Sequence, residues 1–288
     1  MLNYKHLEVQ LARASTLPIL PHVATQLLNI PDSPTVSPKD YERLIIQDTA
    51  MTAKVLRTAN SPLFGGGGRI TTLQRAMALL GFDTVRSICI MVSLQSSSAT
   101  KALGVHFSTA AFWQHSITVA CISKVIATVK HYPKPEEAFL AGLLHDIGKL
   151  AIAMFLPSES REITIRARSE NMADFEAERL VLGTITHEQI GAEVAIRWGL
   201  PDLYLSAIEH HHTPIATDPQ DLSCFVHVAN ILSYQHGLGF GIQGAIHTLD
   251  PMVQVLLGLE QAQYDMIGEK VESEVKKVIQ GLCSAQAA

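Results

Sequence analysis

The sequence of 288 residues contains few cysteines, few aromatic residues and few charges. Its four cysteines, Cys89, Cys121, Cys224 and Cys283, lie far apart and form no CxxC pair. Such spacing is typical of reduced, buried thiols, which excludes a disulfide-stapled domain and indicates a cytoplasmic protein. Aromatic residues make up 6% and charged residues 17%, whereas hydrophobic residues reach 47%, which excludes a disordered chain.

Long hydrophobic runs and an excess of positive charge are also missing. No apolar run approaches the roughly 20 residues that span a bilayer, and the first residues, MLNYKHLEVQLARA, lack the apolar stretch of a signal peptide. We therefore expect a soluble protein with no membrane partner. The formal net charge is −5, from 22 Lys and Arg against 27 Asp and Glu. This balance, with basic residues scattered along the chain, argues against nucleic acid as a partner.

The glycine run Gly65–Gly68 lacks the surroundings of a phosphate-binding loop. The motif GxxxxGK[ST] needs a lysine after its last glycine, and here Arg69 and Ile70 follow instead. No strand pattern precedes the run either. We interpret it as a flexible turn between two helices.

Alternating strand patterns are missing throughout, and one helical segment follows another. Apolar residues recur with a period near 3.6, and proline and glycine clusters separate the segments. The predicted helices cover residues 38–48, 73–80, 84–95, 109–129, 136–148, 174–182, 187–198, 202–211, 224–234 and 269–280. The predicted N-cap residues are Ser37, Thr71 or Thr72, Asp83 and Ser108. The sequence therefore predicts an all-α protein.

The two halves of the chain differ in charge. Residues 1–105 hold ten Lys and Arg against six Asp and Glu, and the remainder is acidic. We place a soft boundary in the stretch 96–104 and expect an N-terminal helical subdomain at residues 1–104 and a second unit at residues 105–288. The second unit is rich in histidine, and an acidic, histidine-rich region favours a divalent cation.

The segment LLHDIGKL combines a histidine, an aspartate and a lysine. If residues 136–150 are helical, His145 and Asp146 lie about 100° apart and can bind the same cation. Lys149 follows His145 by four residues and Asp146 by three, so it lies near both. The alternative is a structural pair that closes a helix end, with Asp146 in a salt bridge to Lys149.

Other histidines are candidates for the same site. His210, His211 and His212 are consecutive, and histidine-rich tracts often bind metal. The alternative for this tract is a helix C-terminus, where imidazolium interacts favourably with the helix dipole. His115 and His187 stand alone, and each taken singly is more simply interpreted as a satisfied core histidine. Sequence spacing does not bring these groups together.

The order of these groups resembles the HD superfamily of metal-dependent phosphohydrolases, with an isolated histidine, then HD with a trailing lysine, then a histidine, then HH. More closely, the chain resembles an HDOD protein, the HD-related output domain of bacterial signalling. The phrases LPILPHVATQLL, QDTAMTAKVLRTANSPLF, ITTLQRAMALLGFDTVRSI and AIEHHHTP carry this likeness. It covers residues 15–235 and implies a multi-helix HD-superfamily bundle with an additional N-terminal helical subdomain.

The related HD-GYP proteins carry a dinuclear metal site, and the resemblance implies its ligands here. They would be His115, His145, Asp146, His187, His211 and His212, with Lys149 nearby and His210 as a bystander. The last family ligand, an aspartate, is replaced by Asn230 in VHVANIL, and asparagine is a neutral, weaker ligand. The GxGYP phrase associated with cyclic-di-GMP hydrolysis is missing after His212, which argues against that activity.

Two functions follow from the resemblance. The favoured one is a bacterial signalling or regulatory HDOD module with a partly retained metal site, whose partners are other signalling proteins. The alternative is a metal-dependent phosphohydrolase acting on a nucleotide or another phosphate-containing small ligand, in which Asp146 and Lys149 are the catalytic residues.

The metal and the oligomeric state stay open at this point. A histidine-rich, carboxylate-poor site suits one or two ions of Fe, Mn, Zn, Ni or Co about equally. The amphipathic C-terminal segment 269–280 could pack on its own body or on a second copy of the chain.

Overall fold

The structure, a computed structural model, describes residues 22–28, 30, 37–64, 70–96, 103, 106–183, 185–214, 218, 221–240 and 248–286. In these residues every regular element is a helix and no strand occurs, so the predicted all-α fold is confirmed. The segment before residue 22 and the glycine run Gly65–Gly68 lie outside the described residues.

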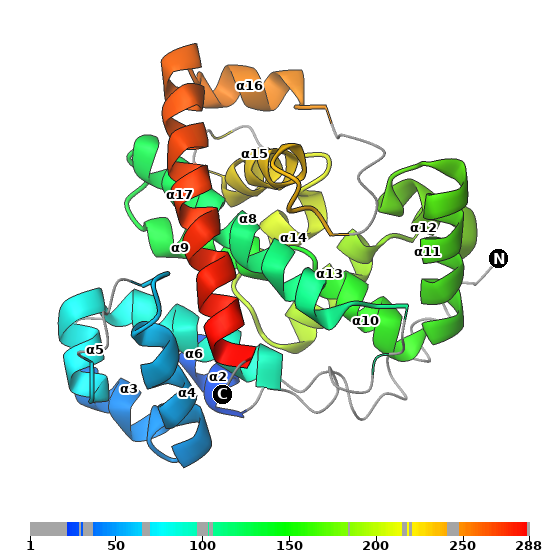
Figure 1. The fold of residues 1–288 in the computed structure, drawn as a ribbon. Coiled ribbons are helices and arrows are strands. Elements are labelled where there is room, and N and C mark those ends of the chain that lie inside the picture. The colour runs from blue at the N-terminus through cyan, green and yellow to red at the C-terminus, as the bar shows by residue number, and fades with distance from the viewer. Residues whose placement is uncertain are drawn as a thin grey trace.

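The helices of the N-terminal part form a group of their own, in blue and cyan in Figure 1. They are α2 His22–Leu28, α3 Pro38–Ile45, α4 Thr49–Ala59, α5 Leu73–Leu80 and α6 Phe82–Ser96. Most of their buried side chains make a hydrophobic cluster of their own, but Ala24 and Leu28 of α2 and Ile90, Met91 and Leu94 of α6 belong to the core of the larger part, where α6 packs against α9. The division into two units at residue 104 remains a prediction.

The N-cap predictions for this part are confirmed at two positions and wrong at a third. Ser37 precedes α3, and the Thr72 hydroxyl accepts a hydrogen bond from the Arg75 amide at 3.2 Å at the start of α5. Asp83 is not an N-cap, because α6 already begins at Phe82. Gly81, with φ of +86°, ends α5 and lets the next helix begin directly after it.

The larger part of the fold is built around α8. Its helices are α8 Thr109–Val129, α9 Pro135–Leu144, α10 Ile147–Phe155, α11 Pro157–Glu170, α12 Asp174–Leu182, α13 His187–Arg197, α14 Asp202–His210, α15 Leu222–Gln235, α16 Pro251–Leu257 and α17 Gln261–Gln286. Helix α8 packs against α9, α15 and α17 and is buried on most of its surface, as expected of a central helix (Figure 1). Ser108 is its N-cap, as predicted, and accepts from the Ala111 amide at 3.2 Å.

The predicted helix 136–148 is interrupted, which corrects the sequence prediction. Helix α9 ends at Leu144 and α10 begins at Ile147, so His145 and Asp146 form a turn between two helices. Asp146 adopts φ of −97° and ψ of 12°, and its carbonyl accepts from the Lys149 amide at 2.9 Å. The 100° spacing expected for a continuous helix therefore does not apply to this pair.

The stretch Pro135–Phe155 has the length and composition of a membrane span, contrary to the expectation that no apolar run approaches that length. Among the described residues it is the one stretch that does, and 89% of its apolar window is buried inside the fold. Its hydrophobic side chains therefore belong to the protein core.

Helices α10 and α13 approach each other at glycine positions. A Cβ atom on Gly148 would lie 1.9 Å from the carbonyl oxygen of His187 and 2.8 Å from the amide nitrogen of Gly191. A Cβ atom on Gly191 would lie 2.8 Å from the Ile208 side chain of α14. This close contact places the start of α10, which follows Asp146, directly beside the start of α13 at His187.

Replacing Gly148 with alanine should lower the free energy of unfolding by about 3 kcal/mol, because the new methyl group overlaps backbone atoms of α13. Urea unfolding followed by circular dichroism measures the effect. Gly268→Ala in α17 is the control, since a Cβ there meets nothing within 4 Å and the substitution should stabilise by up to about 1 kcal/mol. Equal stability of Gly148→Ala and the unmodified protein would contradict this packing.

Candidate metal centre

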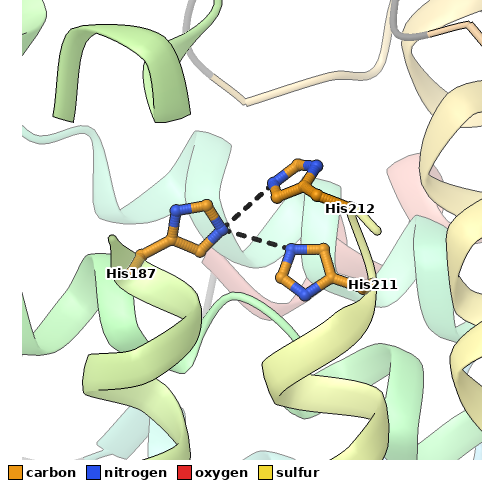
Figure 2. A group of neighbouring side chains, drawn as sticks. All are labelled: His187, His211 and His212. Carbon is orange, nitrogen blue, oxygen red and sulfur yellow. Dashed lines mark hydrogen bonds between the residues drawn. The ribbon is translucent and has the colours of Figure 1, made fainter. Parts of the chain in front are cut away.

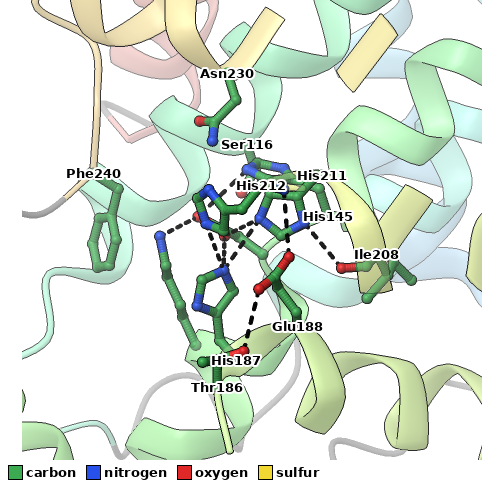
Figure 3. A network of polar contacts seen from close by, with 12 residues as sticks. Ser116, His145, Thr186, His187, Glu188, Ile208, His211, His212, Asn230 and Phe240 are labelled. Carbon is green, nitrogen blue, oxygen red and sulfur yellow. Dashed lines mark hydrogen bonds and ion pairs between the residues drawn. The ribbon is translucent and has the colours of Figure 1, made fainter. Parts of the chain in front are cut away.

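The structure brings the predicted ligand residues together. We call them the His/Asp cluster, which consists of His115, His145, Asp146, His187, His211 and His212. His115 comes from the middle of α8, Asp146 from the turn before α10, and His187 from the first position of α13. The paired histidines follow α14 directly. Segments up to about a hundred residues apart in the chain thus meet at one point inside the bundle (Figure 3).

Asp146 lies at the centre of the cluster. Its Oδ2 atom is 3.5 Å from Nε2 of His115 and 3.4 Å from Nε2 of His145. Its Oδ1 atom is 3.2 Å from Nε2 of His187 and 3.6 Å from Nε2 of His211. Each carboxylate oxygen therefore faces a different pair of histidines.

The cluster divides into two groups that could each hold an ion. One group is His115, His145 and Asp146, and the other is His187, His211 and His212; within each, the ligand atoms lie within 4.8 Å of one another. In the second group Nε2 of His187 is 3.2 Å from the Nε2 atoms of both His211 and His212 (Figure 2). Asp146 lies between the groups, so its two carboxylate oxygens would be available to cations held in either group.

Hydrogen bonds from the Nδ1 atoms, on the side of each ring that faces away from Asp146, orient three of the histidines. The backbone carbonyls of Leu238, Gly142 and Ile208 accept hydrogen bonds from Nδ1 of His115, His145 and His211, at 3.1, 2.7 and 2.9 Å. A carbonyl only accepts, so these bonds place the ring proton on Nδ1. The Nε2 lone pairs of the three neutral rings are then free to face the cluster, which is how metal-binding histidines are held.

Burial makes this arrangement costly without a cation. His115, His145, His187 and His211 are fully buried and Asp146 is 1% exposed. The Nε2 atoms of His115 and His145 and the Oδ1 atom of Asp146 have no hydrogen-bond partner among the described residues. Buried polar atoms are rarely left unpaired, and cations held in the two groups would satisfy these atoms. The donor set and its unpaired atoms therefore fit a transition metal.

The ionisation of the metal-free cluster follows from burial and from its charges. Burial lowers the pKa of His115, His145 and His211, which keeps these rings neutral and able to bind a metal. Burial acts in the same direction on His187, but the carboxylates of Glu178 and Asp146 outweigh it and raise the pKa of His187 to about 10. A metal at His187 must therefore displace a proton.

The charge of Asp146 is held in place by its neighbours. Burial alone would raise the pKa of the Asp146 carboxyl, yet His145 and Lys149 hold it well below its usual range. The Lys149 ammonium donates to Oδ2 of Asp146 at 2.8 Å and lies 5.9 Å from the centre of the Phe240 ring. The salt-bridge interpretation of HDIGK thus describes an observed contact, and Lys149 pairs with the same carboxylate that faces the histidines.

A cavity of about 240 Å³ adjoins the cluster at Lys149. Its lining also includes Asp174 and Glu178 of α12, the exposed Arg168 of α11, and Phe240. A lining that combines charged side chains with an aromatic ring is typical of a small-molecule pocket. None of the six cluster residues is among the lining residues, so a bound molecule would contact the cluster through Lys149, which pairs with Asp146.

Asn230, the position of the missing family aspartate, lies beside the cluster. It is 2% exposed on α15, and Figure 3 shows its side chain directed toward the histidines. Its Oδ1 atom has no hydrogen-bond partner among the described residues. His210 contributes nothing to the cluster, since its ring nitrogen instead lies 3.9 Å from Glu209.

Sequence reasoning missed residues that surround the cluster. Glu178 accepts a hydrogen bond from Nδ1 of His187 at 2.7 Å, Glu188 accepts one from the His212 amide at 3.4 Å, and Nδ1 of His227 donates to the His211 carbonyl at 2.8 Å. Asp174 lines the cavity. No spacing in the sequence signals these contacts, because each depends on how one helix packs against another.

Comparison with known protein families matches residues 17–214 to the HDOD domain. One curated relative, an uncharacterized protein of Treponema pallidum, is 23% identical over 205 residues, which are 69% of this chain. The match spans 38% of the length of that relative.

Solved structures resemble the whole fold. An HDOD domain protein of Geobacter sulfurreducens superposes with a TM-score of 0.82 at 24% identity, over 96% of this chain and 95% of the other. A proposed signal-transduction protein of Marinobacter aquaeolei superposes with a TM-score of 0.76 at 23% identity, over 98% of this chain and 65% of the other. A proposed phosphohydrolase of Shewanella amazonensis superposes with a TM-score of 0.72 at 22% identity, over 95% of this chain and 97% of the other. At these identities the likeness establishes the HD-type helical fold.

Asp174 should make the metal-free protein less stable as its carboxyl ionises. Burial raises its pKa from 3.8 to about 6, so between these values the folded state binds more protons than the unfolded chain, and stability falls as pH rises. Asp174→Asn removes this loss of stability. The unfolding temperature of the variant minus that of the unmodified protein should therefore be larger at pH 7.5 than at pH 4.

Calorimetry of chelator-treated protein measures this difference. Asp202→Asn, at the exposed first residue of α14, controls for an aspartate at the same position of a helix. The prediction would be contradicted if the unfolding temperatures of Asp174→Asn and the unmodified protein differed by the same amount at both pH values.

Proposed function

This chain belongs to the HDOD family, and we propose that it is a signalling or regulatory module that binds one or two divalent transition-metal ions in the His/Asp cluster. The observation that carries the proposal is the convergence of four imidazole Nε2 atoms on the two oxygens of Asp146 inside the bundle. Fe, Mn, Zn, Ni or Co would suit this donor set.

The regulatory interpretation is supported by what the cluster contains and what it lacks. Asn230 takes the place of a carboxylate, which leaves Asp146 as the one anionic member among six cluster residues and Asn230. Fewer anionic ligands weaken binding of a second divalent ion. A structural neighbour described as a proposed signal-transduction protein agrees with this interpretation. Other signalling proteins would then bind the module, and their binding would depend on whether metal occupies the cluster.

Metal analysis of protein purified without chelators or added metal tests the proposal. We expect one to two equivalents of a transition metal per chain by elemental mass spectrometry. Asp146→Asn should lose most of it, because the central carboxylate contacts both groups of histidines. His211→Asn should also lose metal, whereas the adjacent His210→Asn should keep it.

The His210 and His211 variants form a matched pair, since they are consecutive in the chain and undergo the same substitution. Absence of metal in the unmodified protein, even after reconstitution, would refute the proposal. An equal loss of metal in both variants would refute the assignment of His211.

A second candidate function is hydrolysis of a phosphate ester, which the cavity beside Lys149 favours. Divalent ions, when bound, supply Lewis acidity toward phosphoryl oxygens and water. The Lys149 ammonium, 6% exposed at the inner end of the cavity, would stabilise negative charge on a phosphoryl group beside Asp146. The Phe240 ring would keep water away from this end of the cavity.

Hydrolysis of p-nitrophenyl phosphate and bis(p-nitrophenyl) phosphate by metal-loaded protein tests this candidate. Lys149→Met keeps most of the side-chain volume but removes the charge, so it should lower kcat by about 100-fold or more while metal remains bound. No hydrolysis by fully metal-loaded, unmodified protein would favour the purely regulatory function. A rate that is unchanged in Lys149→Met would exclude the role of Lys149.

A further inference from the structure

His187 differs from the other oriented histidines of the cluster in what holds its ring. His115, His145 and His211 donate from Nδ1 to backbone carbonyls, whereas Nδ1 of His187 lies 2.7 Å from Oε2 of Glu178. The same carboxylate oxygen accepts the backbone amide of His187 at 2.8 Å. One oxygen atom therefore holds both the start of α13 and the ring of its first residue.

Glu178 is buried in a place where a carboxylate is costly. It is 2% exposed on α12, and His187 is fully buried. Glutamate is almost never buried to this degree unless it is paired. Both of the hydrogen bonds recorded for its side chain go to His187, so this residue accounts for the burial of the Glu178 charge.

A carboxylate behind an imidazole changes how that ring binds a metal. It places the proton on Nδ1, directs Nε2 to the opposite side and raises the basicity of Nε2, more than a neutral carbonyl does. Here Nε2 of His187 points at Oδ1 of Asp146 and at the rings of His211 and His212 (Figure 2). Glu178 thus acts on the ring at the centre of the second histidine group.

Helix α12 supports the second histidine group at another point. The Phe175 ring stacks on His212, with centroids 5.0 Å apart and an angle of 29° between the planes. Phe175 and Glu178 are three residues apart and so lie on one face of α12. The helix therefore contacts two of the three histidines in this group without supplying a ligand itself.

We propose that Glu178 is the positioning residue of the His187–His211–His212 group and that it strengthens metal binding there through His187. This inference rests on the proposed metal site. It also identifies a nearby negative charge for a cluster in which Asp146 is the one carboxylate. With asparagine at position 230, Glu178 is a buried carboxylate one residue removed from the ions, and its negative charge acts on them through the imidazole ring.

Two variants at position 178 separate its charge from its hydrogen bonds. Glu178→Gln keeps an acceptor oxygen for His187 and removes the charge, whereas Glu178→Ala removes both. Zn²⁺ affinity measured by competition with a chromophoric chelator should fall about 10- to 100-fold in Glu178→Ala, with Glu178→Gln in between. Glu176→Gln, on the exposed side of the same helix, should bind Zn²⁺ like the unmodified protein.

A second measurement needs no metal. In metal-free protein, the Nδ1–H resonance of His187 in ¹H–¹⁵N spectra should be shifted far downfield and protected from exchange. Glu178→Ala should abolish this signal, and Glu178→Gln should retain it with a smaller shift. These spectra test the positioning of the ring even if the proposed metal site fails.

The outcomes separate the two proposals. If the unmodified protein binds neither Zn²⁺ nor Fe, Mn, Ni or Co ions, the proposed function fails, and the Nδ1–H signal still decides whether Glu178 holds His187. If the metal binds and Glu178→Ala binds it as tightly as the unmodified protein does, the positioning role is overturned. Thermal unfolding of each variant identifies a loss of affinity caused by misfolding. If Glu178→Ala misfolds, the Zn²⁺ affinity of Glu178→Gln decides the question, because glutamine has the same shape as glutamate.

Discussion

The burial of the Asp146 charge is the constraint on which the rest of the structure depends. An ionised carboxylate that is 1% exposed loses nearly all of its hydration, a cost of several kcal/mol that only nearby cations and hydrogen-bond donors offset. Lys149 supplies one such partner from the same turn, at 2.8 Å. The other partner is the protonated ring of His187 on α13, whose Nε2 lies 3.2 Å from Oδ1 of Asp146, so the charge is compensated only once α13 has packed against α10. Site and bundle therefore form one cooperative unit.

The cluster contains more lone pairs than protons, which is the physical basis for the proposed binding of cations. Three of its rings carry their proton on Nδ1, where backbone carbonyls accept it, so their Nε2 lone pairs point at one another and at Asp146. The proton on His187, whose pKa is raised to about 10, satisfies part of this arrangement in the metal-free protein. A divalent ion satisfies more of it, because one ion accepts several lone pairs at once.

The sequence predicted the fold class and the members of the cluster better than it predicted the surroundings of the cluster. Local signals were sufficient for α8, whose N-cap Ser108 and apolar period are both encoded within the helix. The HD pair was identified from a short motif, but the break between α9 and α10 was not, since residues 136–150 have uniform helical character and the turn is set by packing against α13. Glu178 left no signal at all, because a glutamate on an amphipathic helix is normally solvated.

Helix α9 connects the N-terminal helices with the His/Asp cluster. Near its start, Glu136 accepts a hydrogen bond from Thr84 of α6 at 2.8 Å and pairs with Lys124 of α8. At its other end the chain enters the turn of His145, whose ring is tied back to the Gly142 carbonyl. A helix of ten residues, of which the last seven are buried, thus connects a contact with the N-terminal helices to a member of the cluster. The packing of α6 against α9 therefore helps to fix the position of His145. The N-terminal helices support the cluster in this way, although none of its six residues comes from them.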